Sequence, residues 1–301
     1  MSEEVSKLVI ASGDRIMSRA TTGDTLDRWE LSSPIPGMRI INTWQIFNRI
    51  WLALALTEDG HYNIFRSIDL QKYSLVHEHQ SRIYGLFFVD DGHMLFCAED
   101  GWWATTDTGV TWEEAIDDLC MEVRAPAISI IALGAGAWRL IAYGLDHKIY
   151  SRDYPIGMWS EVYDTNEIWT DKWYPAIAGC SVGILAGAGS YLLRSDSLGE
   201  GGSWSTIQTV DGVIRDVVVS NQSNLPVFLI VVTPTGGDEI DKVYLSYDMG
   251  DSLVADASRA GLVASVQAVT PTGTGELQTT FALVGKRTSD GTQSIRLIQE
   301  G

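Results

Sequence analysis

Basic residues recur at one place in this sequence, just before a short apolar segment. They are Arg39, Arg82, Arg124, Lys172 and Arg215, with Arg259 a little earlier in the last unit. The whole chain holds only 21 lysines and arginines, so composition alone does not explain this recurrence. Cationic side chains bind carboxylate and phosphate oxygens, and guanidinium groups do so through paired hydrogen bonds. If equivalent positions meet around one axis, these residues form a basic ring at a channel mouth that binds an anion or an acidic segment of a partner. The alternative is that each caps the preceding outer strand or pairs with a local acid such as Asp118, Asp171 or Asp216.

Other residue groups that could support chemistry have simpler interpretations. His77-Glu78-His79 places two imidazoles on one face of a strand,. No further zinc ligand is spaced usefully nearby, so we expect solvent-facing histidines. Carboxylates that a glycosidase would need are plentiful, but most lie in turns such as Asp90-Asp91-Gly92 and Glu99-Asp100-Gly101, where Asp and Gly serve the turn itself,. We therefore expect no catalytic residues, no bound metal and no cofactor.

Charge and composition restrict the partners. The chain has 301 residues and a formal net charge of −18, which disfavours nucleic acid and anionic membranes as partners,. The three cysteines, Cys97, Cys120 and Cys180, show no metal-binding spacing, and we expect buried reduced thiols,. The N-terminal residues lack the pattern of a signal peptide, and the apolar runs are too short to span a bilayer. These features predict a protein that is cytoplasmic when synthesised.

The elements that must position these residues follow from a repeat. The clearest copy is Thr105-Thr106-Asp107-Thr108-Gly109-Val110-Thr111-Trp112, which predicts a strand, a tight turn and a second strand. Asp107 can accept hydrogen bonds from amides within the turn, and Gly109 supplies a positive φ. Degenerate copies retain some of these positions: Ser67 and Asp69; Ser151, Asp153 and Trp159; Asp196 and Trp204; and Ser246, Asp248 and Gly250.

The repeat predicts an all-β fold of four-stranded units. Its anchors are Ser18, Ser67, Thr105, Ser151, Arg194, Ser246 and Ser294, a period of about 45 residues that matches one blade of a β-propeller,. In the third unit we expect strands at Tyr84–Val89, His93–Ala98, Trp102–Thr106 and Trp112–Ile116. The first and last units have room for three strands each. We expect a single domain over residues 1–301, a propeller of four-stranded antiparallel blades that is seven-bladed or, if the last inner strand completes the first blade, six-bladed.

The segment Thr105–Trp112 resembles the Asp-box pattern, S/T-x-D-x-G-x-T/S-W. With its degenerate copies, the chain is similar to the sialidase-type Asp-box (BNR-repeat) propellers and to photosystem-assembly factors that share these repeats. The resemblance implies a propeller but no single activity, because such repeats occur in enzymes, lectins, sorting receptors and phage virion proteins. The sialidase catalytic set is incomplete: the nearest approaches to its Phe-Arg-Ile-Pro motif are Met38-Arg39-Ile40 and Ser81-Arg82-Ile83, both without the proline.

The functional expectation is therefore a non-enzymatic module for protein interaction or assembly. The resemblance adds the possibility of a virion component of a tailed phage, in the tail, neck or capsid. The alternative is a carbohydrate-binding lectin or a glycoside hydrolase of the same propeller type. Exposed tryptophans could stack on sugars, but their positions differ between units, so no repeated pocket emerges.

Overall fold

The computed structural model describes residues 7–12, 14–20, 30–46, 50–90, 93–115, 124–134, 137–154, 156–165, 174–220, 226–235, 240–255, 262–269, 280–286 and 293–299. Every regular element among these residues is a β-strand, and the strands join only antiparallel neighbours. Within this part of the chain, no helix has the length and apolar character needed to cross a membrane. The chain falls into two compact units, residues 1–124 with 271–275 and residues 125–270 with 276–301.

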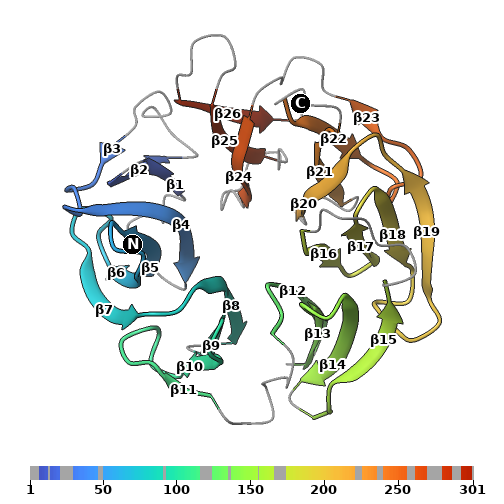
Figure 1. Ribbon diagram of the computed structural model, residues 1–301, viewed down its shortest axis with the longest axis horizontal. Coiled ribbons are helices and arrows are strands. Elements are labelled where there is room, and N and C mark those ends of the chain that lie inside the picture. The colour runs from blue at the N-terminus through green and yellow to red at the C-terminus, as the bar shows by residue number, and fades with distance from the viewer. Residues whose placement is uncertain are drawn as a thin grey trace. The chain divides into compact units, whose positions relative to one another are not determined.

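The first unit contains three sheets (Figure 1, blue to green). The first sheet has three strands, β1 (Lys7–Ser12), β2 (Arg15–Ala20) and β3 (Glu30–Leu31). The second has four, β4 (Met38–Ile46), β5 (Ile50–Thr57), β6 (Tyr62–Ser67) and β7 (Ser74–His79). The third also has four, β8 (Ile83–Asp90), β9 (His93–Ala98), β10 (Trp102–Thr105) and β11 (Glu113–Glu114). These four agree with the strands expected for the third repeat.

The second unit contains four sheets (Figure 1, green to red). Three have four strands: β12 (Ala127–Gly134), β13 (Ala137–Tyr143), β14 (Lys148–Tyr154) and β15 (Ser160–Asp164); β16 (Ala176–Cys180), β17 (Gly183–Ala188), β18 (Tyr191–Ser195) and β19 (Trp204–Thr209); and β20 (Val213–Ser220), β21 (Val227–Thr233), β22 (Lys242–Ser246) and β23 (Val254–Ala255). The last has three, β24 (Leu262–Val269), β25 (Thr280–Lys286) and β26 (Gln293–Gln299).

Within each unit, neighbouring sheets pack against each other, and the core lies between them. In the first unit, Leu52 and Ile64 of one sheet meet Met94 and Phe96 of the next, and all four are fully buried. In the second unit, equivalent layers lie between the β12–β15 and β16–β19 sheets and between the β16–β19 and β20–β23 sheets. A sheet covered on both faces needs apolar side chains on both sides of its strands. This requirement explains why β17 and most of β21 are uninterrupted buried runs.

The first strands of neighbouring sheets lie side by side. Strand β1 contacts β4 in the first unit, and β12, β16, β20 and β24 contact one another in succession in the second. The last strands are short and exposed, as in β3, β11 and β23. Each blade therefore runs from a packed first strand to a solvent-facing last one.

The predicted number of blades is wrong. The sequence suggested seven blades, or six, of four-stranded type, whereas five sheets are four-stranded antiparallel blades and the sheets at the two ends of the chain have three strands. The repeats were counted from the motif that each unit carries at the end of one strand, and this motif does not show how many strands the unit contains. In the first sheet, β3 still pairs with Ser18 although Ala20 replaces the Asp, whereas in the last sheet Ser294 lies in β26 and no described strand follows. The three-stranded ends themselves agree with the room that the sequence leaves there.

Two cysteine thiols lie in the core. Cys97 and Cys180 are buried in β9 and β16, and they form no disulfide bond among the described residues. Cys120 lies outside the described residues. Burial raises the pKa of the Cys180 thiol, which keeps it protonated at neutral pH,.

Candidate binding site at the start of the first strands

The turn between β10 and β11 has the hydrogen bonds that its residues predict. The Thr105 hydroxyl donates to the Asp107 carboxylate at 2.7 Å and accepts from the amide of Gly109 at 3.1 Å. Asp107 also accepts from the amides of Val110, at 3.0 Å, and Thr111, at 2.9 Å. Burial acts to raise the pKa of Asp107, but the hydrogen bonds from Thr111 and Thr105 outweigh it and hold that pKa at about 2,. Trp112 then closes the turn against the core.

A second turn, between β22 and β23, repeats this arrangement. Ser246 donates to Asp248 at 3.0 Å and accepts from the amide of Gly250 at 2.7 Å, and Asp248 accepts from the amide of Ser252 at 2.9 Å. Hydrogen bonds from Ser252 lower the pKa of Asp248. These two turns shape the outer part of their blades and hold no group aimed at a ligand.

The other copies differ in their contacts. In the β18–β19 turn, Ser195 accepts from the amide of Gly199 at 2.8 Å, Asp196 lies 2.9 Å from Arg194, and Trp204 is buried. In the β14–β15 turn, strand pairing sets Asp153 opposite Arg139, and Asp153 occupies the place that Ser195 holds in its own sheet. The Asp153 carboxylate accepts two hydrogen bonds from Arg139, at 2.6 and 3.1 Å. Ser151 pairs with Ser160, and Trp159 is half-buried.

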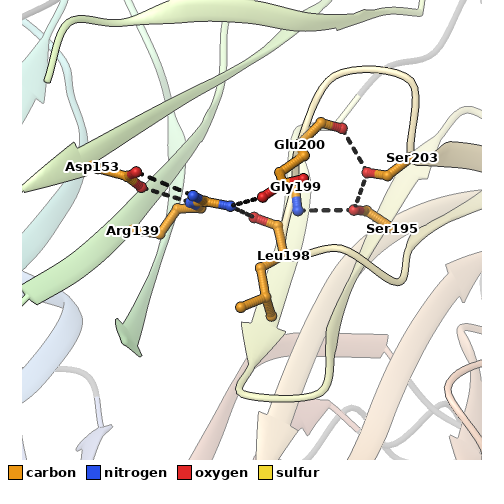
Figure 2. Close-up of polar contacts among 7 residues, drawn as sticks. All are labelled: Arg139, Asp153, Ser195, Leu198, Gly199, Glu200 and Ser203. Atoms are coloured by element: carbon orange, nitrogen blue, oxygen red, sulfur yellow. Dashed lines mark hydrogen bonds and ion pairs between the residues drawn. The ribbon is translucent and has the colours of Figure 1, made fainter. Parts of the chain in front are cut away.

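An arginine reaches from one sheet into the turn of the next in three places. Arg66 donates to the Thr108 carbonyl at 3.1 Å, Arg139 to the Leu198 carbonyl at 3.5 Å, and Arg194 to the Met249 carbonyl at 3.4 Å. Each carbonyl belongs to a residue with positive φ, at 60°, 51° and 58° respectively. Figure 2 shows the second case, in which Arg139 also contacts Asp153 and Glu200. These bridges hold neighbouring blades together.

Two of the predicted basic residues converge at the start of β8. The Arg82 guanidinium carbon lies 5.4 Å from the centre of the Tyr84 ring, and Arg124 donates to the Asp100 carbonyl at 3.1 Å. Burial and the charge of Glu99 raise the pKa of Tyr84, while the positive charges of Arg82 and Arg124 both oppose that rise. We call Arg82, Tyr84 and Arg124 the arginine cluster. It joins residues that lie on either side of a whole blade in sequence.

A histidine pair lies behind the arginine cluster. His79 Nε2 is 2.9 Å from the Asp100 carboxylate, and His79 Nδ1 is 3.4 Å from His77 Nε2. Both rings pack against Trp103, and His79 is only 4% exposed. The expectation of solvent-facing histidines is therefore wrong. A bulge between Ile64 and Phe65 marks the pairing of β6 with β7, and the imidazoles of β7 face the aromatic layer of the next sheet.

A second charged group lies at the start of β20. Arg215 Nη1 is 3.2 Å from Asp241, whose side chain is 1% exposed and also accepts a 2.7 Å hydrogen bond from Thr233. Arg215 is the bulged residue between Ile214 and Asp216. Burial raises the pKa of the neighbouring Asp216 to about 6, although the charge of Arg215 acts in the opposite direction. This arginine has a local acidic partner, but that partner is Asp241.

Strand register separates the predicted basic residues into two classes. Bulges occur at Ile40/Asn42 in β4, Ile83/Gly85 in β8 and Ile214/Asp216 in β20. Arg39 and Arg82 precede their bulges, whereas Arg215 occupies its own, the place of Tyr84 in β8. Lys172 and Arg259 lie outside the described residues. Of the predicted ring, the structure brings together Arg82 and Arg124; whether the set forms one site stays a prediction.

Within the described ranges, no group of three or more His, Cys, Asp or Glu side chains is arranged to hold a metal ion. Asp117, Asp118 and the whole segment Gly236-Gly237-Asp238-Glu239 fall outside those ranges.

Comparison with known proteins identifies the fold. No protein-family model matches this sequence, and no curated protein matches it. Solved structures do match. The crystal structure of BBS1N in complex with ARL6DN, soaked with mercury, aligns at a TM-score of 0.62 and 12% identity over 99% of this chain and 88% of that chain. The lead-soaked form of the same complex gives 0.61 and 11% with the same coverage.

A third match is a chain of the mitotic checkpoint complex, with a TM-score of 0.61, 12% identity, and coverage of 98% of this chain and 84% of that chain. This chain has a β-propeller fold. At such low identity the likeness shows the fold alone, and the Asp-box resemblance stays a resemblance.

Sequence reasoning missed the three bridging arginines. A signal for two of them was present, because Arg66 directly precedes the anchor Ser67 and Arg194 is itself the anchor of its unit. Arg139 gave no such signal, since it bridges from the second strand of its sheet instead of the third. The buried Asp241 was also missed, because it precedes β22 in a segment without a turn motif.

Proposed function

We propose that this propeller is a non-enzymatic protein-interaction module, and that its arginine cluster binds a carboxylate on an acidic segment of a partner protein. The observation that carries the proposal is the position of Arg82 against the Tyr84 ring, with Arg124 bonded to the carbonyl of Asp100, whose neighbour Glu99 donates its amide to the Arg82 carbonyl. Two guanidinium groups beside an aromatic hydroxyl offer several donors in fixed directions, which suits carboxylate recognition.

The surroundings of the arginine cluster favour an anion. The 3.1 Å hydrogen bond from Arg124 goes to a neutral backbone carbonyl, so that contact leaves the guanidinium charge in place. The Asp100 carboxylate is engaged by His79 at 2.9 Å, and the exposed Glu99 is the acidic side chain that acts on Tyr84. The guanidinium groups of Arg82 and Arg124 supply the positive charge that the proposal assigns to the arginine cluster.

The neighbouring structures are compatible with this proposal. One matched chain was solved in complex with ARL6DN, and another within the mitotic checkpoint complex. Those are properties of those proteins, and they support interaction as a use of the fold without indicating a partner for this chain. Membership of a larger particle, including a tailed-phage virion, stays a prediction, as does synthesis in the cytoplasm.

The test uses a synthetic peptide of alternating glutamate and glycine as the probe. We expect it to bind the full chain and to bind at least about tenfold more weakly to an Arg82→Ala, Arg124→Ala double variant, as for loss of a central charged contact. Lys72→Ala is the matched control, because it removes an exposed positive charge from the neighbouring sheet. Equal weakening in all variants, or no binding to the wild-type chain, contradicts the proposal.

The carbohydrate alternative has its own readout. A glycan array and a panel of aryl glycosides, tested on the same preparation, separate a lectin or a hydrolase from a protein-binding module. Hydrolysis of any glycoside, or a glycan that competes with the acidic peptide, would favour the alternative.

A further inference from the structure

The turn between β14 and β15 exposes apolar side chains more fully than any other described segment. Ile156 and Met158 are each 87% exposed, and the next most exposed large apolar residue is Ile68, at 65%. Ile68 is a single apolar residue within the β6–β7 turn, whereas Ile156 and Met158 stand together in one turn. Single exposed apolar residues are ordinary on protein surfaces, but a pair grouped in one turn is typical of a contact surface.

Aromatic and aliphatic residues from the same end of the sheet extend this surface. Antiparallel pairing brings the end of β12, the start of β13 and the end of β14 to one edge. Leu133 is 40% exposed there, and the half-buried rings of Trp138 and Tyr154 lie 5.9 Å apart. We call Leu133, Trp138, Tyr154, Ile156 and Met158 the apolar edge. Tryptophan and tyrosine are the residue types that contribute most to binding in protein interfaces.

Two exposed carboxylates lie at the same end of the sheet, on the face opposite to Trp138 and Tyr154. Asp153 is 50% exposed and Glu200 is 63% exposed, and both contact the single guanidinium of Arg139 (Figure 2). The two carboxylates are exposed while Arg139 and the adjacent Arg152 are largely buried, and the formal net charge of the whole chain is −18. Charge complementarity therefore calls for positive charge on the partner.

We propose that the apolar edge is a docking surface for a partner protein that inserts apolar side chains flanked by lysine or arginine. The surface lies wholly in the second unit, and it depends on neither Arg82 nor Arg124. The partner proposed here is positively charged, whereas the segment proposed for the arginine cluster is acidic.

The experiment selects peptides from a random library displayed on phage, with the full chain as bait. We expect enriched peptides to combine aromatic or aliphatic residues with lysine or arginine. A synthetic peptide of the enriched sequence should bind an Ile156→Ser, Met158→Ser double variant at least about tenfold more weakly than the wild-type chain. Both side chains are almost fully exposed, so the melting temperature of this variant should match that of the wild-type chain.

Two controls make the result specific. Ile68→Ser removes an exposed isoleucine from the β6–β7 turn, and Arg82→Ala damages only the arginine cluster; neither should change binding of the enriched peptide by more than about twofold. Enrichment of acidic peptides, equal binding to the double variant, or no enrichment at all overturns the proposal. Concentration-dependent self-association of the chain that the double variant abolishes also overturns it, because a second copy would then be the occupant.

Discussion

Two glycines of one turn allow a clean test of packing between blades. Gly199 and Gly202 both lie between β18 and β19, with φ values of +82° and +79°. An alanine at either position meets the same left-handed backbone, which costs about 1 kcal/mol for a residue with a Cβ. The two positions differ in space: a Cβ at Gly199 would lie 2.5 Å from Cδ1 of Ile141 and 3.1 Å from Cδ1 of Ile184, whereas a Cβ at Gly202 meets nothing within 4 Å.

We expect Gly202→Ala to lower the free energy of unfolding by about 1 kcal/mol and Gly199→Ala to lower it by about 2 to 4 kcal/mol. The difference arises because Ile141 and Ile184 are fully buried between two sheets and have little room to move, and overpacking of this kind costs about 1 to 3 kcal/mol,. Urea denaturation followed by tryptophan fluorescence measures both values. Equal losses for the two variants would refute the reasoning, since the backbone alone would then account for both.

Three further variants test single contacts. Burial and the charge of His79 lower the pKa of His77 to about 4, so the contribution of neutral His77 to stability is complete above pH 6.5 and is lost as the pH falls through 4,. This loss is about 3 kcal/mol in the free energy of unfolding, and urea denaturation of His77→Phe should not show it. Burial raises the pKa of Asp216 to about 6, so its contribution to stability is complete below pH 3.8 and is lost as the pH rises through 6,. Between pH 4 and 7, the free energy of unfolding of Asp216→Asn should therefore rise relative to that of the wild-type chain by up to about 3 kcal/mol. A difference that stays constant over this range would contradict the assignment. Arg194→Met should cost about 1 to 2 kcal/mol in the same assay, and Arg194→Lys should recover only part of it, because lysine can reach Asp251 but cannot also bond the Met249 carbonyl in the same fork,.

The repeat and its strands could be predicted from the sequence because local chemistry specifies them. The segment Thr105–Trp112 carries its own donors and acceptors, and the contacts of Asp107 lie within five residues. Alternation of apolar runs and turns located β8, β9 and β10 closely. The number of complete blades was not accessible in this way, since the repeat motif marks one strand end in each unit and does not count the strands of the two end sheets.

The candidate site could be predicted only in part, because strand register decides which side chains are equivalent. Arg82 and Arg215 look alike in the sequence, but one precedes a bulge and the other occupies one. A single bulged residue changes the position of every side chain that follows it. The buried acid that binds Arg215 is also distant in sequence, so no local pattern indicates the pairing.

The bridges from Arg66, Arg139 and Arg194 end on main-chain oxygens, at Thr108, Leu198 and Met249. A main-chain oxygen is the acceptor that the three bridges have in common, beside side-chain contacts to Thr108, Glu200 and Asp251 that differ from one bridge to the next. Residues at the tips of these turns can therefore be substituted while the main-chain contacts between neighbouring sheets are kept. A propeller of this kind can accept new recognition loops without losing the contacts between its blades. Its repeats then become difficult to align by residue type alone.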